Sequence, residues 1–205
     1  MQIPTTALEH LRQDAQLRSI IDRIELTFSR PQTGDVYFDL LRSIAGQQLS
    51  VKAAKTIFGR FENLFESGYP HPEEVLALEI ETLRSVGFSR QKSSYIQNVA
   101  QFFQENQLEM KDWSGMTNEE IVAYLSQIKG VGKWTVQMIL MFSLQRWDVL
   151  PVDDLGIQNA MIDLYKIEEK GRNLKQKMVE IATRWQPYRS VACFYLWRYK
   201  DNMLV

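Results

Sequence analysis

One stretch of the chain, residues 117–161, constrains the fold most, because helical patterns there alternate with strong helix breakers. Thr117 and Glu120 have the spacing of a capping box, in which two side chains satisfy backbone N–H groups at a helix start. Gly130 and Gly132 then end that helix, and apolar residues at helical spacing resume directly after them. A short turn and two adjacent carboxylates precede a third helical pattern. The stretch therefore predicts a helix, a glycine hairpin, a second helix, a turn and a third helix.

The glycine hairpin has the properties of an anion site. Glycines let the backbone approach a ligand closely, and the next helix presents N–H groups and the positive end of its dipole. Lys133 directly follows Gly132 and adds a full positive charge, so a DNA phosphate would fit there. From the glycines alone, a tight corner without any ligand is the more frequent interpretation.

Two motifs in this stretch together resemble a known family. The segments K-G-V-G-K-W-T-V (129–136) and V-L-P-V-D-D-L-G-I (149–157) are similar to the helix–hairpin–helix, Gly/Pro…Asp (HhH-GPD) superfamily of DNA glycosylases. The tryptophan after G-V-G-K resembles the 3-methyladenine DNA glycosylase II branch, in a compact form without an extra N-terminal β-sheet domain. The similarity extends from about Phe38 to Trp197, and residues 43–55 and 184–197 support it.

The resemblance implies an all-α fold with two helical lobes and a DNA-binding cleft between them. The chain itself shows no convincing strand alternation, which favours the same fold class. We expect a central lobe over about residues 35–150. The second lobe is expected to combine residues 1–34 with residues 151–205.

Asp153 and Asp154 are the candidate catalytic carboxylates. Cleavage of an N-glycosidic bond develops positive charge on the deoxyribose, and a fixed carboxylate stabilises that charge and can orient or deprotonate water. Register with the family makes Asp154 the catalytic residue and Asp153 a structural one. The alternative is that both only cap the following helix, as aspartate commonly does.

Trp134 occupies the position at which bifunctional relatives carry a lysine that forms a Schiff base. The resemblance therefore implies a monofunctional enzyme that uses water. Alkylated purines are cationic and stack well on electron-rich rings, and the resemblance assigns Trp134 and Trp197 to the base pocket. Tyr188 is a further candidate, and Met138 replaces a family tyrosine, which makes the pocket less polar and more pliable. Taken singly, each aromatic residue is more often part of a core.

The remaining expected DNA contacts lie at loops and helix starts. In the resembled family, the loop around residues 45–50 enters the minor groove and fills the space left by the flipped nucleotide. Gln48 or Leu49 is the candidate plug, and register favours Gln48. The alternative is an amide cluster that satisfies a turn. The other predicted contacts are Gly130, Gly132, Lys133, Thr135, Ser89 and Lys92. For Ser89 and Lys92, a helix cap with solvated charges is an equally good interpretation.

Composition limits the cofactors and the compartment. Cys193 is the only cysteine, so the chain can form neither an internal disulfide nor a four-cysteine iron–sulfur site. No cofactor is required on this interpretation, although the resemblance implies a structural Na⁺ or K⁺ at the carbonyls of Ile128 and Gly130. No apolar run could span a membrane, and the first residues lack a signal peptide, so we expect the protein in the cytoplasm, at the nucleoid or in the nucleus. We also expect a monomer. The net charge of −1 argues weakly against DNA binding, unless the basic residues share one face.

The function expected from these features is hydrolysis of alkylated purines, such as 3-methyladenine and 7-methylguanine, from damaged double-stranded DNA in base excision repair. Two alternatives remain open. One is a helix–hairpin–helix module that binds DNA without catalysis. The other is a glycosylase for deaminated or etheno bases.

Overall fold

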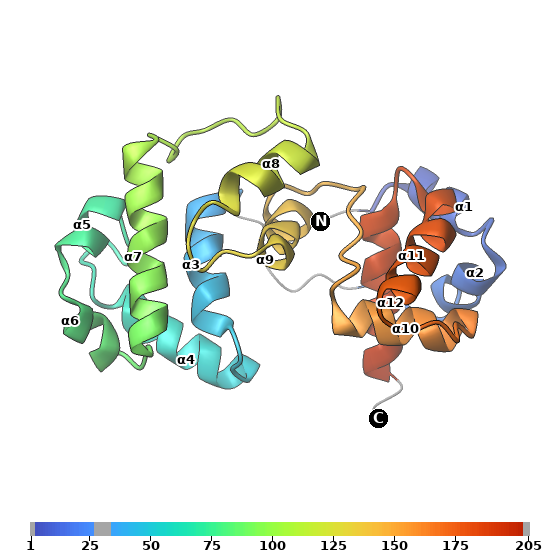
Figure 1. Cartoon of the computed structure of the whole chain (residues 1–205), viewed down its shortest axis with the longest axis horizontal. Helices are drawn as coiled ribbons and strands as arrows, with labels where there is room; N and C mark the ends of the chain where they lie inside the picture. The colour runs from blue at the N-terminus through green and yellow to red at the C-terminus, as the bar shows by residue number, and fades with distance from the viewer. Residues whose placement is uncertain (1–2, 27–33, 203–205) are drawn as a thin grey trace. The chain divides into compact units, whose positions relative to one another are not determined.

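The computed structural model describes residues 3–26 and 34–202, and the regular structure in these two ranges is entirely helical (Figure 1). This confirms the predicted all-α class. The chain divides into two compact units: unit 1 is Met1–Gln32 with Leu140–Val205, and unit 2 is Thr33–Ile139. Within the described ranges, no helix combines the length and the apolar character that crossing a bilayer requires.

Unit 2 is built around the long helix α7, which contacts α3, α5 and α6. Its buried residues Ile96, Val99, Ala100 and Phe103 recur at helical spacing and form one apolar face. The helices of this unit are α3 (Val36–Gly46), α4 (Val51–Glu62), α5 (Pro72–Ala77), α6 (Ile80–Ser85), α7 (Arg90–Glu105), α8 (Asn118–Leu125) and α9 (Lys133–Met138).

The predicted helix–hairpin–helix is present as α8, the glycine hairpin and α9. Thr117 Oγ1 accepts a hydrogen bond from the Glu120 N–H at 3.2 Å, and a Glu120 carboxylate oxygen accepts one from the Thr117 N–H at 2.7 Å. This reciprocal pair confirms the predicted capping box. Gly132 is the N-cap of α9, which runs without a break into a π-helical turn, η1 (Ile139–Ser143).

Unit 1 joins the first two helices to the C-terminal helices. Its remaining elements are α1 (Thr5–Leu11), α2 (Ala15–Ile21), α10 (Leu155–Tyr165), α11 (Gly171–Ala182), the 3-10 turn η2 (Thr183–Trp185) and α12 (Arg189–Asn202). Helix α12 packs against both α2 and α10. Asp14 is 3% exposed, caps α2 and also accepts a hydrogen bond from the indole N–H of Trp185 at 3.1 Å.

The division differs from the predicted lobes at one boundary. The second part of unit 1 begins at Leu140 and not near residue 151, because residues 146–149 are bound to the start of α12. Arg189 holds Asp148 with two hydrogen bonds, of 2.6 and 3.0 Å. Ser190 Oγ donates to the Arg146 carbonyl and accepts from the Val149 N–H. The other predicted boundary, at residues 34 and 35, adjoins residues 27–33, which lie outside the described ranges.

Candidate active site

Asp154 is held at the N-terminus of α10 by local and distant donors. It is the N-cap residue, and its Oδ1 accepts a hydrogen bond from the Ile157 N–H at 2.9 Å. The same oxygen accepts the indole N–H of Trp197, on α12, at 2.8 Å. The side chain is half-buried, so the carboxylate is fixed in orientation but still accessible. A carboxylate held in this way can face a developing positive charge without first reorganising.

Trp197 belongs to an aromatic cluster in unit 1. Its ring stacks on Phe142 at a centroid distance of 5.8 Å and an interplanar angle of 23°, and Phe194 lies 6.2 Å away. Phe142 projects from the π-helical turn η1 and is 41% exposed, although it is a large apolar side chain. Single-turn π-helices are frequent at functional sites. The cluster therefore places an exposed aromatic ring, which sequence reasoning did not identify, against Trp197.

Gly156 allows Asp154 and Trp197 to approach each other. A Cβ atom at this position would lie 3.0 Å from Trp197 Cδ1 and 3.1 Å from Asp154 Oδ1. Both distances are tighter than ordinary van der Waals contact, so a larger residue would displace one side chain or the other. A glycine in the first turn of a helix lowers helix propensity. This unfavourable residue is the sequence signal that could have pointed to a close approach at position 156.

Asp153 is paired separately. Its carboxylate accepts a hydrogen bond from the ammonium of Lys175, which lies on α11. The two adjacent aspartates therefore have different partners, since Asp154 accepts from a backbone N–H and an indole N–H. This difference agrees with the predicted roles, a structural Asp153 and a reactive Asp154, although it does not test them.

Tyr188 is not among the residues gathered around Asp154. Its hydroxyl lies 3.4 Å from Thr6 Oγ1, and its ring makes an edge contact with His10, so it packs against α1. Trp197 follows nine residues later, which corresponds to about 13 Å along a helix. The assignment of Tyr188 to the base pocket remains a prediction.

The hairpin in unit 2 is shaped by contact with α7. Gly130 has a φ of +104°, and a Cβ atom there would lie 2.2 Å from the Tyr95 ring. Both the backbone conformation and the close ring therefore require glycine at this position. Asn98, one turn further along α7, donates to the Lys129 carbonyl at 3.0 Å. By contrast, Gly132 has open space around it and a φ of −92°.

The first turns of α9 separate the predicted site residues into two groups. Lys133 and Trp134 are exposed, with Trp134 at 41%, and Met138 is half-buried one turn after Trp134 on the same face. The side chain of Thr135 is 3% exposed and belongs to the core of unit 2. Position 135 thus faces inward on this helix, and a DNA contact at Thr135 remains a prediction.

The predicted cation ligands are backbone carbonyls of the hairpin. The Ile128 carbonyl already accepts the Val131 N–H at 3.0 Å, and the neighbouring Lys129 carbonyl accepts from Asn98. A carbonyl oxygen has a second lone pair, so neutral oxygen donors in this turn still fit a hard monovalent cation. Ile128 and Gly130 therefore remain the residues that would hold such an ion.

The candidate plug lies in a short loop between α3 and α4. Gln48 has a φ of +58°, which is in the left-handed region, and its side chain is exposed. The Leu49 N–H closes a turn onto the Gly46 carbonyl at 3.2 Å, and the Leu49 side chain is 39% exposed. Ser50 then caps α4. Both candidates for the plug therefore project from the surface of unit 2.

Two other predicted DNA contacts have structural roles. Ser89 is the N-cap of α7, and its hydroxyl accepts the Lys92 N–H at 3.2 Å. The Lys92 ammonium donates to the carbonyls of Ala45 and Gln47, at 2.8 and 2.7 Å. The Lys92 ammonium thus has two partners within the protein, and its contact with phosphate remains a prediction.

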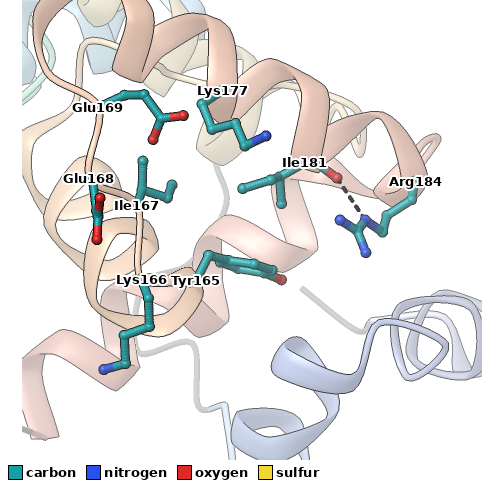
Figure 2. A pocket seen from close by; sticks show the side chains of 8 residues that line it. All are labelled: Tyr165, Lys166, Ile167, Glu168, Glu169, Lys177, Ile181 and Arg184. Carbon is teal, nitrogen blue, oxygen red and sulfur yellow. Dashed lines mark hydrogen bonds between the residues drawn. The ribbon is translucent and has the colours of Figure 1, made fainter.

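Unit 1 also contains a hollow (Figure 2). It is formed where the end of α10 and the following turn meet α11, and charged side chains of both signs line much of it. Its lining residues are Tyr165, Lys166, Ile167, Glu168, Glu169, Lys177, Ile181 and Arg184. None of the predicted site residues is among them.

Several known proteins are similar to this chain in both sequence and structure. Residues 41–187 match the HhH-GPD superfamily base excision DNA repair protein family. The DNA-3-methyladenine glycosylase 1 of Schizosaccharomyces pombe is 37% identical over 164 residues, which span 79% of this chain and 71% of that relative. A DNA-3-methyladenine glycosidase from Bacillus halodurans is 32% identical, with a TM-score of 0.84 over 100% of this chain and 93% of its own. A 3-methyladenine DNA glycosylase from Schizosaccharomyces pombe, solved in complex with abasic DNA, is 33% identical, with a TM-score of 0.79 over 96% of this chain and 97% of its own.

Proposed function

Because the chain belongs to the HhH-GPD superfamily of base excision DNA repair proteins, we propose that it is a monofunctional DNA glycosylase. It hydrolyses the N-glycosidic bond of alkylated purines, of the 3-methyladenine and 7-methylguanine type, in duplex DNA. The observation that carries this proposal is the half-buried Asp154 carboxylate, held by the Trp197 indole N–H beside an accessible aromatic ring.

The reaction assigned to Asp154 follows from its charge. As the bond from C1′ to the purine nitrogen breaks, the electron pair leaves with the base and the sugar becomes cationic. The fixed carboxylate stabilises that cation, water adds to C1′, and the proton of the water passes to the carboxylate or to solvent. An N3- or N7-alkylated purine carries a positive charge before cleavage, so it leaves as a neutral base and needs little acid catalysis.

The groups assigned to DNA lie mainly in unit 2. Lys133 and the backbone around Gly130 and Gly132 would bind a phosphate, because the exposed charge of Lys133 directly follows Gly132, which has open space around it. Trp134 and Met138 would contact the flipped base, and the exposed face of Trp134 suits a cationic purine, with a gain of about 0.5–2 kcal/mol. Gln48 or Leu49 would fill the space in the duplex.

Damaged double-stranded DNA is therefore the proposed partner, and the enzyme would act where DNA is kept, at a bacterial nucleoid or in a nucleus. We also propose that a single copy of the chain acts on each lesion, which light scattering after size exclusion would check on the free protein and on its DNA complex.

One observation favours the non-catalytic alternative. Asp154 caps α10, which by itself would explain an aspartate at this position. The two functions differ in what Asp154→Asn changes. Asparagine is also a good N-cap, so a purely structural residue would tolerate the substitution. A catalytic carboxylate would not, because the amide has no negative charge.

The test compares Asp154→Asn with Asp153→Asn on methylated duplex DNA, with the released bases identified by chromatography and mass spectrometry. We expect Asp154→Asn to lose base release by at least about a hundredfold, with DNA affinity and thermal unfolding nearly unchanged. Asp153→Asn is the matched control and should retain most activity. Equal activity of wild type and Asp154→Asn would refute the proposal. Parallel duplexes with hypoxanthine or ethenoadenine would establish whether deaminated or etheno bases are preferred.

A further inference from the structure

The side chain of Lys92 reaches from α7 to the end of α3. Its ammonium donates to two carbonyl oxygens, of Ala45 at 2.8 Å and of Gln47 at 2.7 Å. Carbonyls at a helix C-terminus have no partner within the helix, and the negative end of the helix dipole favours a cation there. Partial burial lowers the pKa of Lys92. The ammonium thus caps the C-terminus of α3 and holds Gln47, the residue that follows the helix.

The loop that contains this attachment, residues 46–50, has a backbone conformation that needs support. Gln48 adopts a φ of +58°, which costs a residue with a Cβ atom on the order of 1 kcal/mol. The loop is fixed at its far end by Ser50, whose hydroxyl accepts the Ala53 N–H at 3.3 Å. Between the two anchors, only Gln48 and Leu49 remain to project.

We infer that Lys92 is a positioning residue, which holds the loop 46–50 in the conformation that places Gln48 or Leu49 into the duplex. The inference rests on the proposed function, since it takes the insertion of this loop into DNA from there. It assigns Lys92 a role different from the phosphate contact predicted by sequence. Its charge acts on the protein backbone, 45–47 residues away along the chain.

The physical reason is preorganisation. An inserted side chain has to replace the stacking that the flipped base loses, which is worth a few kcal/mol per base step. If the loop were mobile in the unbound protein, ordering it would consume part of that energy.

The first test uses the protein without DNA. In Lys92→Met the stem is kept and the ammonium is lost, and hydrogen exchange is followed by mass spectrometry on peptides that cover residues 45–50. We expect the amides of Gln47 and Leu49 to exchange about tenfold faster or more, because the turn loses its anchor. Lys52→Met removes a charge from the exposed start of α4 and should leave this exchange unchanged. Unchanged exchange in Lys92→Met would overturn the inference.

The second test measures single-turnover base release in a double-mutant cycle. Lys92→Met should slow release several-fold in the wild-type background. It should have little further effect once Gln48→Ala and Leu49→Ala have removed the inserting side chains. An equal effect in both backgrounds would contradict the inference, since Lys92 would then act independently of the loop.

A salt titration separates positioning from phosphate binding. If Lys92 touched phosphate, Lys92→Met would reduce the slope of log Kd against log salt by about one. We expect no reduction. Should Lys92→Met fail to fold by circular dichroism, Lys92→Gln, which can still donate to one carbonyl, would undergo the same comparisons. A wild-type protein without base release would refute the proposed function, while the hydrogen-exchange result would still decide whether Lys92 anchors the loop.

Discussion

Trp197 donates its indole N–H to Oδ1 of Asp154 across 2.8 Å, and this bond connects α12 to the first turn of α10. The tryptophan thus fixes the orientation of the carboxylate, in addition to its proposed role of offering a ring face to a base. Phe142 stacks on that ring and limits its rotation. A catalytic group held by a side chain that is itself packed can keep its geometry through the reaction.

The two roles of Trp197 can be separated by Trp197→Phe, which keeps an aromatic ring and removes the N–H donor. Hydrogen bonds to charged groups contribute about 1.5–3 kcal/mol, so we expect base release at saturating DNA to slow by roughly ten- to a hundredfold. Single-turnover kinetics on a 7-methylguanine duplex would measure this. Phe142→Leu is the companion variant, with a smaller expected loss. A Trp197→Phe enzyme with wild-type rate would show that the ring alone matters.

Gly156→Ala should displace either Trp197 or Asp154. The added methyl group would lie about 3 Å from both Trp197 and Asp154, so one of them must shift by a few tenths of an ångström. Misplacement of a catalytic group by a small distance lowers rates strongly, and we expect roughly a tenfold slower base release with little change in the free energy of unfolding. Gly59→Ala, at a helical glycine with open space around it, is the control and should retain full activity. An unaffected rate in Gly156→Ala would mean that the pair adapts.

The parts of this site that could be predicted are those that depend on local sequence. The capping box at Thr117, the hairpin at Gly130 and the helix start at Asp154 each follow from neighbouring residues, and the structure has all three. The Trp197–Asp154 bond joins residues 43 positions apart, and it depends on how two helices pack. The same reason explains why the two bonds from Lys92 to carbonyls 45 and 47 residues away could not be predicted from the sequence. The burial of Thr135 could not be predicted either, because the helix–hairpin–helix motif does not specify which face of its second helix is buried.

Asp14→Asn should destabilise unit 1. The buried carboxylate accepts hydrogen bonds from two N–H groups of α2 and from Trp185, and the Arg184 guanidinium lies 3.5 Å away. Both carboxylate oxygens accept hydrogen bonds, whereas an amide has only one accepting oxygen and its NH₂ group donates. We therefore expect a loss of about 2–4 kcal/mol in the free energy of unfolding. Urea denaturation would measure it. Asp22→Asn changes an exposed carboxylate paired with Arg12 and is expected to leave the free energy of unfolding nearly unchanged. Similar losses for both variants would contradict the assignment.

The capping box gives α8 a dependence on pH. The backbone N–H and the hydroxyl of Thr117 lower the pKa of Glu120 below its usual 4.5. The carboxylate is charged in the folded state at acidity that would protonate it in the unfolded chain, so its contribution is present above the unfolded pKa. That contribution is lost as the pH falls through the lowered, folded pKa. Unfolding measured from about pH 6 downward should therefore show a weaker acid dependence in Glu120→Gln than in wild type, and identical profiles would refute this.

The hairpin glycines provide the sharpest contrast in stability. Gly130→Ala combines a φ of +104° with a Cβ atom only 2.2 Å from the Tyr95 ring, so α7 and the hairpin would have to separate. We expect a loss of about 3 kcal/mol or more in the free energy of unfolding. Gly132→Ala meets open space at a φ of −92°, and its loss should stay below about 1 kcal/mol. In Gly130→Ala combined with Tyr95→Ala, the steric part should disappear and the backbone part remain. If Gly130→Ala were as stable as Gly132→Ala, the contact between α7 and the hairpin would not be as close as the structure places it.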